Sequence, residues 1–191
     1  ASSNGAPPSS SSMMWSTVAL ATRLTPLSNW TAGMKAKVLR SFGAYLVAIH
    51  ITKGGSTYPH MVKWSAEALQ PGSVPPSWDE ADATKDSGEY DLFDVNSGLL
   101  VDAMNLAGKM FLYKESATWV MRFVGGRAVF AIDPLYETSG ILAPRCVVVT
   151  GDGKHQVVAT QDDLIIHNGG EPASILSHRL RREIFARIDS A

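Results

Sequence analysis

The sequence predicts an all-β fold in which short antiparallel strands form β-propeller-like blades. Three observations support this prediction. Runs rich in β-branched and aromatic residues are bounded by Gly, Asp and Asn turns, strand–turn–strand units recur along the chain, and two of the units align at a fixed spacing. With 191 residues, of which 45% are hydrophobic, the chain is long enough for one domain or for part of a larger one.

The first predicted unit begins with the apolar run Val38–Ile51 and returns through 58–64. Between the two runs lies Lys53-Gly54-Gly55-Ser56, and a Gly-Gly pair between strands is typical of a β-hairpin. Residues 66–88 are rich in Pro, Gly, Ser and Asp, which predicts a long loop. Trp78 within this loop is expected to anchor it by packing.

Two further units follow. In the second, strands are predicted at 109–114, 118–123 and 128–132, which together form a three-stranded meander. In the third, strands are predicted at 146–149, 155–160 and 164–167. The Asp-Gly pair in Gly151-Asp152-Gly153-Lys154 favours a tight hairpin, because these residues tolerate a positive φ.

The second and third units align with each other at an offset of 45 residues, which places Phe111 on Gln156 and Trp119 on Leu164. Tyr45-Leu46-Val47 fits the same place in the first unit. A repeat of roughly 40–50 residues with several short strands is typical of a propeller. A closed propeller needs at least about four blades. We therefore expect about three blades of an incomplete ring, which partner segments or a longer chain would complete.

The two ends of the chain differ from its centre. Residues 1–31 begin with a Ser-rich stretch and are expected to form a flexible or extended arm, whereas 32–170 hold the blades. In the C-terminal segment 171–191, Leu176, Leu180 and Ile184 recur at helical spacing and predict a short amphipathic helix or turn. The chain starts with Ala and stops soon after this segment, which indicates a partial chain.

Composition argues against several classes of protein. The formal net charge is −1, so no overall attraction to nucleic acid or to a membrane surface is expected. The single cysteine, Cys146, cannot form an internal disulfide and is interpreted as a small buried hydrophobe. No apolar stretch is long enough to span a membrane, and the first residues lack the apolar core of a signal peptide.

Acidic residues and histidines provide weak candidates for catalysis or metal binding. A glycosidase needs two carboxylates on opposite sides of a sugar, and a Ca²⁺ site needs several oxygen ligands, but turn chemistry explains these Asp residues better. The histidines lack the paired spacing of a zinc site, so we predict no catalytic, cofactor-binding or metal-binding residue. The residues considered are Asp79, Glu80, Asp82 and Asp86 for a glycosidase, Asp152, Asp162 and Asp163 for calcium, and His50, His60, His155, His167 and His178 for zinc.

Aromatic and basic residues are two further sets of candidates. Core packing is favoured over the stacking of sugars or bases for Trp64, Trp78, Trp119, Tyr45 and Tyr113. The most concentrated basic residues are Arg179, Arg181 and Arg182, next to His178. They are the candidate contacts to DNA phosphates or to acidic residues of a neighbouring subunit, and the alternative is a solvated helix face.

Several stretches in order resemble a family of tailed-phage virion proteins, the tail nozzle of short-tailed phages, also called tail tubular protein B. The resemblance extends from Leu27 to Ala186. The matching stretches are 26–30, 42–48, 58–65, 112–115, 123–126 with Phe130, 140–144, 153–155 and 163–169. Chains of this family usually continue beyond the equivalent of Ile184-Phe185-Ala186, which also favours a partial chain.

This resemblance implies a structural virion protein of the phage tail, without enzyme activity or a cofactor. Tail nozzles form a homo-oligomeric ring, typically a hexamer, below the adaptor and portal. They end the DNA-ejection conduit, contact passing DNA transiently and dock fibre proteins. Such a protein would be assembled in the host cytoplasm and located in the virion tail. The alternatives are a carbohydrate-active propeller and a receptor- or fibre-binding module.

Overall fold

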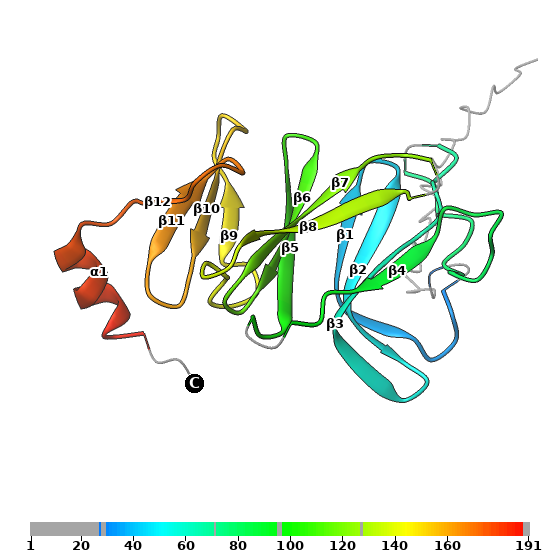
Figure 1. Ribbon diagram of the computed structural model, residues 1–191, viewed down its shortest axis with the longest axis horizontal. Helices are drawn as coiled ribbons and strands as arrows, with labels where there is room; N and C mark the ends of the chain where they lie inside the picture. Colours follow the sequence, from blue (N-terminus) through cyan, green and yellow to red (C-terminus); the bar gives the residue numbers. More distant parts are fainter. Residues whose placement is uncertain (1–26, 28–29, 71, 95–96, 127, 189–191) are drawn as a thin grey trace, which may run out of the picture.

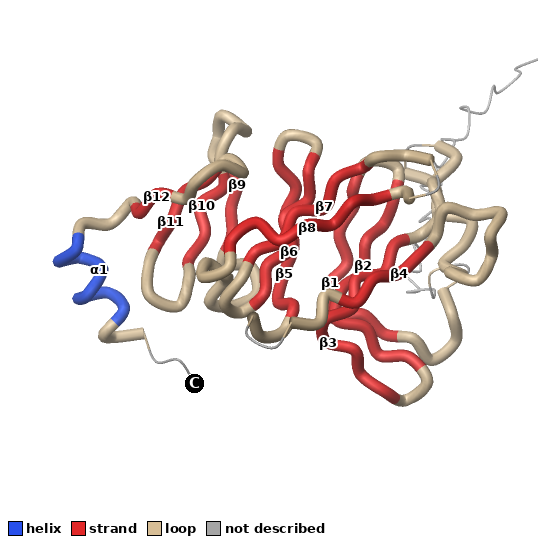
Figure 2. Tube along the Cα trace, viewed as in Figure 1, coloured by secondary structure: helices blue, strands red, loops and turns tan. Residues whose placement is uncertain are grey.

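The computed structural model describes residues 27, 30–70, 72–94, 97–126 and 128–188 of the chain. In this part of the chain, strands dominate and one short helix lies near the C-terminal end, so the fold is all-β as predicted (Figures 1 and 2). The strands form three antiparallel sheets of four, here named sheets I, II and III, each built from four consecutive strands. The predicted arm at 1–31 falls outside the described residues except for its last part.

Sheet I follows the chain in the order β1-β2-β3-β4. Its strands are β1 (Lys35–Phe42), β2 (Tyr45–Lys53), β3 (Ser56–Trp64) and β4 (Gly88–Asp91). The predicted run Val38–Ile51 is therefore two strands, because the chain turns at Gly43, where φ is 58°. The predicted hairpin between β2 and β3 is confirmed. Gly54 and Gly55 both have positive φ, as a two-residue hairpin turn requires.

Sheet II has one strand more than the predicted meander. It consists of β5 (Leu100–Leu106), β6 (Lys109–Lys114), β7 (Thr118–Phe123) and β8 (Phe130–Tyr136). The bounds of β6 and β7 agree with the prediction. Strand β5 was missed because Asp102 and Asn105 interrupt its apolar pattern.

Sheet III also has four strands where three were predicted. They are β9 (Val147–Val149), β10 (Gln156–Ala159), β11 (Leu164–His167) and β12 (Ala173–Ser174). The predicted hairpin between β9 and β10 is present, but only one residue of its Asp-Gly pair has a positive φ. That residue is Gly153. Asp152 instead accepts hydrogen bonds from the backbone N–H of Lys154 and the hydroxyl of Thr150.

The three sheets lie in a row with their faces packed together, and sheets I and III occupy opposite ends (Figure 1). Strand β6 in the middle is buried on both faces. Met110 and Leu112 pack toward sheet I, whereas Phe111 and Tyr113 pack toward sheet III, as the alternation of a strand requires. This double burial explains the continuous apolar run that the sequence shows there.

The 45-residue alignment matches the correct strands but is one residue out of register. It pairs Tyr113 with Val158, yet Val158 faces the preceding sheet and Tyr113 faces the following one. The residues that end the equivalent hairpins are Tyr113 with Thr118 and Ala159 with Leu164, which differ by 46 positions. A slip of one residue exchanges the two faces of a strand, so the register comes from the structure.

The outer face of sheet I carries a third apolar cluster that covers it. Trp78, which is fully buried, packs there against Ile51 and Met61, and Trp30 meets its ring edge-on at 4.7 Å between centroids. The predicted anchoring of the long loop by Trp78 is thus confirmed. As a result, this loop together with Leu27, Trp30 and Met34 covers the face of sheet I that points away from sheet II.

Candidate functional site

The predicted helix exists as α1 (His178–Phe185) and carries the candidate basic residues. Ser177 caps it by accepting a hydrogen bond from the N–H of Leu180. Arg181 is tied to the fold through Asp163 on sheet III, with 3.2 Å between Nη1 and Oδ2. The side chains of Arg179 and Arg182 are exposed and have no ion-pair partner among the residues that the structure describes. The predicted basic patch therefore divides into one structural arginine and two accessible ones.

The apolar side chains of this C-terminal segment are also exposed. None of the residues of α1 is buried, and Leu180, Ile184 and Ile188 are respectively 49%, 42% and 38% exposed. In Figure 1 the helix lies beyond sheet III, at the end of the row. An amphipathic helix with an uncovered apolar stripe is more typical of a contact surface than of a helix that only stabilises its own fold.

The acidic residues of the loop 66–88 are held in local interactions. Asp79 and Asp82 accept backbone hydrogen bonds from residues two positions later, as turn carboxylates do. Glu80 pairs with the fully buried Lys63, which also bonds to Glu89 on β4. Burial acts to raise the pKa of Glu80, but the hydrogen bond and charge of Lys63 outweigh it and lower this pKa to about 2. This pairing fixes the loop to sheet I.

The other candidate acids likewise serve turns and strand contacts. Asp163 is mostly buried and accepts hydrogen bonds from the N–H of Leu164, the hydroxyl of Ser174 and Arg181. Asp162 lies in the same turn, where its own N–H bonds to the hydroxyl of Thr160. Within the described residues, no three His, Cys, Asp or Glu side chains gather closely enough to hold a metal ion.

The predicted aromatic residues all pack. Trp78, Tyr45 and Tyr113 are buried, whereas Trp64 and Trp119 lie half-buried against the cluster between sheets I and II. Cys146 lies just before β9 rather than within it, half-buried against the cluster between sheets II and III.

His167 belongs to a buried polar network between sheets II and III. Its Nδ1 accepts the N–H of Gly169, and its Nε2 lies 2.9 Å from the hydroxyl of Tyr113. That hydroxyl donates to the side-chain oxygen of Gln156. These bonds are satisfied together when His167 is neutral and protonated on Nε2. Burial, with a smaller contribution from the charge of His155, lowers the pKa of His167 to about 4.

This network predicts a loss of stability in mild acid. The unfolded chain takes up a proton at His167 near its ordinary pKa of 6.5, whereas the folded chain resists protonation down to about pH 4. The free energy of unfolding should therefore fall by about 3 kcal/mol in total as the pH falls from about 6.5 to about 4. Urea unfolding across this range measures the slope. His167→Gln should flatten it while the exposed-site control His178→Gln should not, and equal slopes in all three proteins would refute the assignment.

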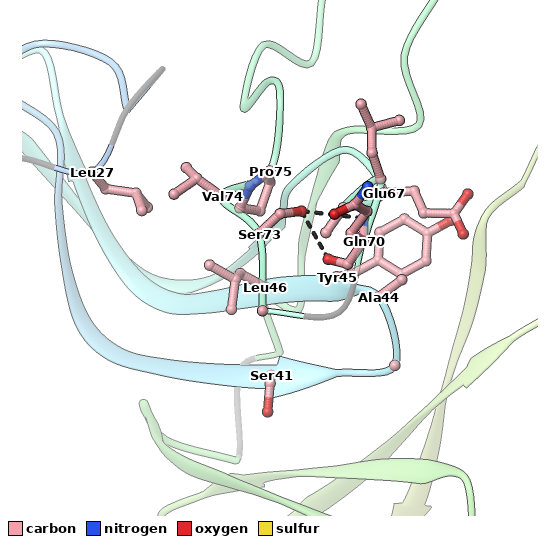
Figure 3. Close-up of a pocket in the computed structure, with 14 residues that line it drawn as sticks. Leu27, Ser41, Ala44, Tyr45, Leu46, Glu67, Gln70, Ser73, Val74 and Pro75 are labelled. Atoms are coloured by element: carbon pink, nitrogen blue, oxygen red, sulfur yellow. Dashed lines mark hydrogen bonds between the residues drawn. The ribbon is translucent and has the colours of Figure 1, made fainter.

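An apolar groove lies where the loop 66–88 meets the β1–β2 turn, and sequence analysis did not predict it. A cavity of about 630 Å³ is lined by residues that include Leu27, Leu46, Leu69 and Val74 (Figure 3). A neighbouring cavity of about 480 Å³ adds the rings of Phe42, Phe123 and Phe130. The two cavities share Gly43, Ala44, Tyr45 and Glu67, and we call them together the loop groove.

The walls of the loop groove are fixed by backbone hydrogen bonds. The N–H of Ala68 bonds to the carbonyl of Ala44 at 2.8 Å, and the N–H of Ala66 bonds to Ser77 at 2.9 Å. Within the loop, Ser73 and Gln70 share three hydrogen bonds, one between their backbones and two through the Ser73 hydroxyl (Figure 3). Two large apolar side chains are nevertheless exposed, Leu69 at 87% and Val74 at 51%. Their presence in an otherwise polar loop was the sequence signal that could have indicated this site.

Comparison with known proteins adds no relative. No protein-family model matches the chain, and no curated protein matches it significantly. Among the described residues, no helix combines the length and the apolar character that crossing a bilayer requires. The functional interpretation therefore depends on the arrangement of the sheets, on α1 and on the loop groove.

Proposed function

We propose that this chain is a structural component of a phage tail, a nozzle-type ring at the distal end of the DNA-ejection conduit that also docks other tail proteins. The observation that carries the proposal is the row of three four-stranded antiparallel meanders packed face to face. The first strands of the sheets adjoin, because β5 contacts both β1 and β9. Four-stranded sheets repeated around a central channel are the blades of a β-propeller.

In this proposal the three sheets are propeller-type blades. A closed propeller needs at least about four blades, so other subunits or a longer chain would contribute the sheets that complete the ring. The resemblance to tail nozzles supports this interpretation, because its stretches between Leu27 and Ala186 extend over all three sheets. The assembly would be a homo-oligomer, with a hexamer expected, located in the virion tail after assembly in the host cytoplasm.

The charge distribution is compatible with a conduit. The formal net charge of −1 gives passing DNA little to bind, since stable binding needs many Lys and Arg contacts to phosphates. Arg179 and Arg182 are the candidates for brief contact with DNA or with a neighbouring subunit. Adaptor, portal and fibre proteins are the proposed partners at the other surfaces.

The composition of purified particles tests the proposal. In phage particles produced by a genome that encodes this chain, quantitative mass spectrometry should detect it at a constant copy number, with six copies expected per tail. The portal protein provides the internal standard. A chain that is abundant in the lysate and absent from purified particles would contradict the proposed function.

A further inference from the structure

We propose that α1 of one copy docks into the loop groove of the next copy, so that copies of this chain associate head to tail. This inference deepens the homo-oligomer of the proposed function and rests on it for the biological setting. It names the two surfaces that form the subunit contact. Among the residues that the structure describes, neither surface is covered, and the two match in apolar character and in charge.

The helix supplies an apolar stripe with basic residues beside it. Leu180 and Ile184 are four residues apart and therefore lie along one face of α1, and Ile188 follows just after the helix ends. At 3.6 residues per turn, Arg181 lies beside this stripe, whereas Arg179 and Arg182 point to the opposite face, and Arg187 follows the end of the helix. Amphipathic helices bind grooves through apolar residues at this spacing. The helix thus has the form of a groove ligand.

The loop groove supplies a matching apolar surface. Leu27, Leu46 and Val74 line one part of it, and the rings of Phe123 and Phe130 line the other. Phe123 is 58% exposed although it contacts two other aromatic rings. Exposed apolar residues concentrated in one groove are typical of an interaction site.

The charges of the two surfaces are complementary. Among the described residues that line the loop groove, the charged one is Glu67, which lies beside Tyr45 (Figure 3). Asp86 lies close as well, since its carboxylate accepts a hydrogen bond from the Tyr45 hydroxyl at 3.4 Å. Burial, together with the negative charges of Asp86 and Glu67, raises the pKa of Tyr45 to about 12. A basic helix therefore meets a groove of negative potential.

The placement of the two surfaces requires contact between different copies. Arg181 and Asp163 tie α1 to the far side of sheet III, whereas the loop groove lies over sheet I and its junction with sheet II, away from that end of the row (Figure 1). A helix held at one end cannot reach a groove at the other end of the same chain. Two different surfaces in contact form a heterologous interface, which produces a ring when the rotation between neighbours closes.

Two variants separate the surfaces experimentally. Leu180→Glu with Ile184→Glu changes the helix, and Leu69→Asp with Val74→Asp changes the groove. All four positions are exposed, so the fold should be retained. Sedimentation velocity should show concentration-dependent assemblies for the unchanged chain and monomers for each variant alone. A one-to-one mixture of the two variants should form a heterodimer, because it contains one intact helix and one intact groove.

The controls test charge and specificity. Glu67→Lys should weaken association at least tenfold, and mixing this variant with Arg187→Glu, at an exposed position next to Ile188, should restore part of the loss. Tyr90→Glu introduces a charge at an exposed position on β4 and should leave association unchanged.

Several outcomes would overturn the inference. An unchanged chain that stays monomeric up to about 1 mM would do so, since even a weak specific contact is populated there. Self-association of the helix variant at the level of the unchanged chain would also overturn it. So would helix and groove variants that bind DNA more weakly than the unchanged chain but still self-associate. A chain found in particles but unable to form the heterodimer would refute this contact alone. A heterodimer from a chain absent from particles would refute only the proposed function.

Discussion

Asp102→Ala is expected to lower the free energy of unfolding by about 2–4 kcal/mol, because it removes the buried acceptor of a charged hydrogen bond and of two backbone N–H groups. Asp102 lies on β5 with its side chain 1% exposed. It accepts hydrogen bonds from Arg40 of sheet I at 2.5 Å and from the N–H of Arg145, which precedes sheet III, at 2.8 Å. One carboxylate thereby joins all three sheets. Its loss would leave the N–H groups of Arg145 and Ala103 without an acceptor.

Urea unfolding followed by tryptophan fluorescence measures this effect. The matched control is Asp133→Ala, which breaks the pair of Asp133 with Arg122, where both side chains are about half exposed. Exposed pairs contribute at most about 1 kcal/mol. If Asp102→Ala and Asp133→Ala proved equally mild, the central role of Asp102 would be wrong.

Trp78→Ala is expected to cost about 3–5 kcal/mol, the range for truncating a large, fully buried aromatic residue. The change should also release the loop 66–88 from sheet I, because Trp78 is the buried anchor of that loop. Two measurements apply, urea unfolding and the rate of tryptic cleavage after Lys85. Both the stability loss and faster cleavage are expected in the variant.

The matched control for this prediction is Leu69→Ala in the same loop, since Leu69 is 87% exposed. It should leave both stability and the cleavage rate nearly unchanged. Cleavage after Lys85 at the same rate in Trp78→Ala and the unchanged chain would show that the loop is held by other contacts, such as the pairing of Glu80 with Lys63. Because the loop forms one wall of the loop groove, Trp78→Ala should also weaken self-association.

Much of the fold could be predicted because local patterns determine it. Strands β6, β7 and β11 were located exactly, since each is an apolar run between turn residues. Strands β4 and β12 were missed because they are short edge strands, and Gly88-Glu89-Tyr90-Asp91 and Ala173-Ser174 lack β-branched residues. Their pairing depends on neighbouring strands rather than on their own propensity.

The candidate surfaces were only partly predictable for a similar reason. The spacing of Leu180 and Ile184 indicated the helix, and the basic residues were visible in the sequence. The loop groove was not predicted, because it brings together Leu27, the β1–β2 turn and the loop 66–88, which are far apart in the chain. Tertiary packing also determines that Arg181 pairs with Asp163, whereas the side chains of Arg179 and Arg182 are exposed.

Cryo-electron microscopy of the purified particles tests the central claim most directly. We predict a ring around the DNA channel at the distal end of the tail, into which the three four-stranded sheets of each copy fit. The α1 helix of each copy should contact the loop groove of its neighbour. Density for this chain outside the tail, or as a single copy away from the channel, would contradict the account.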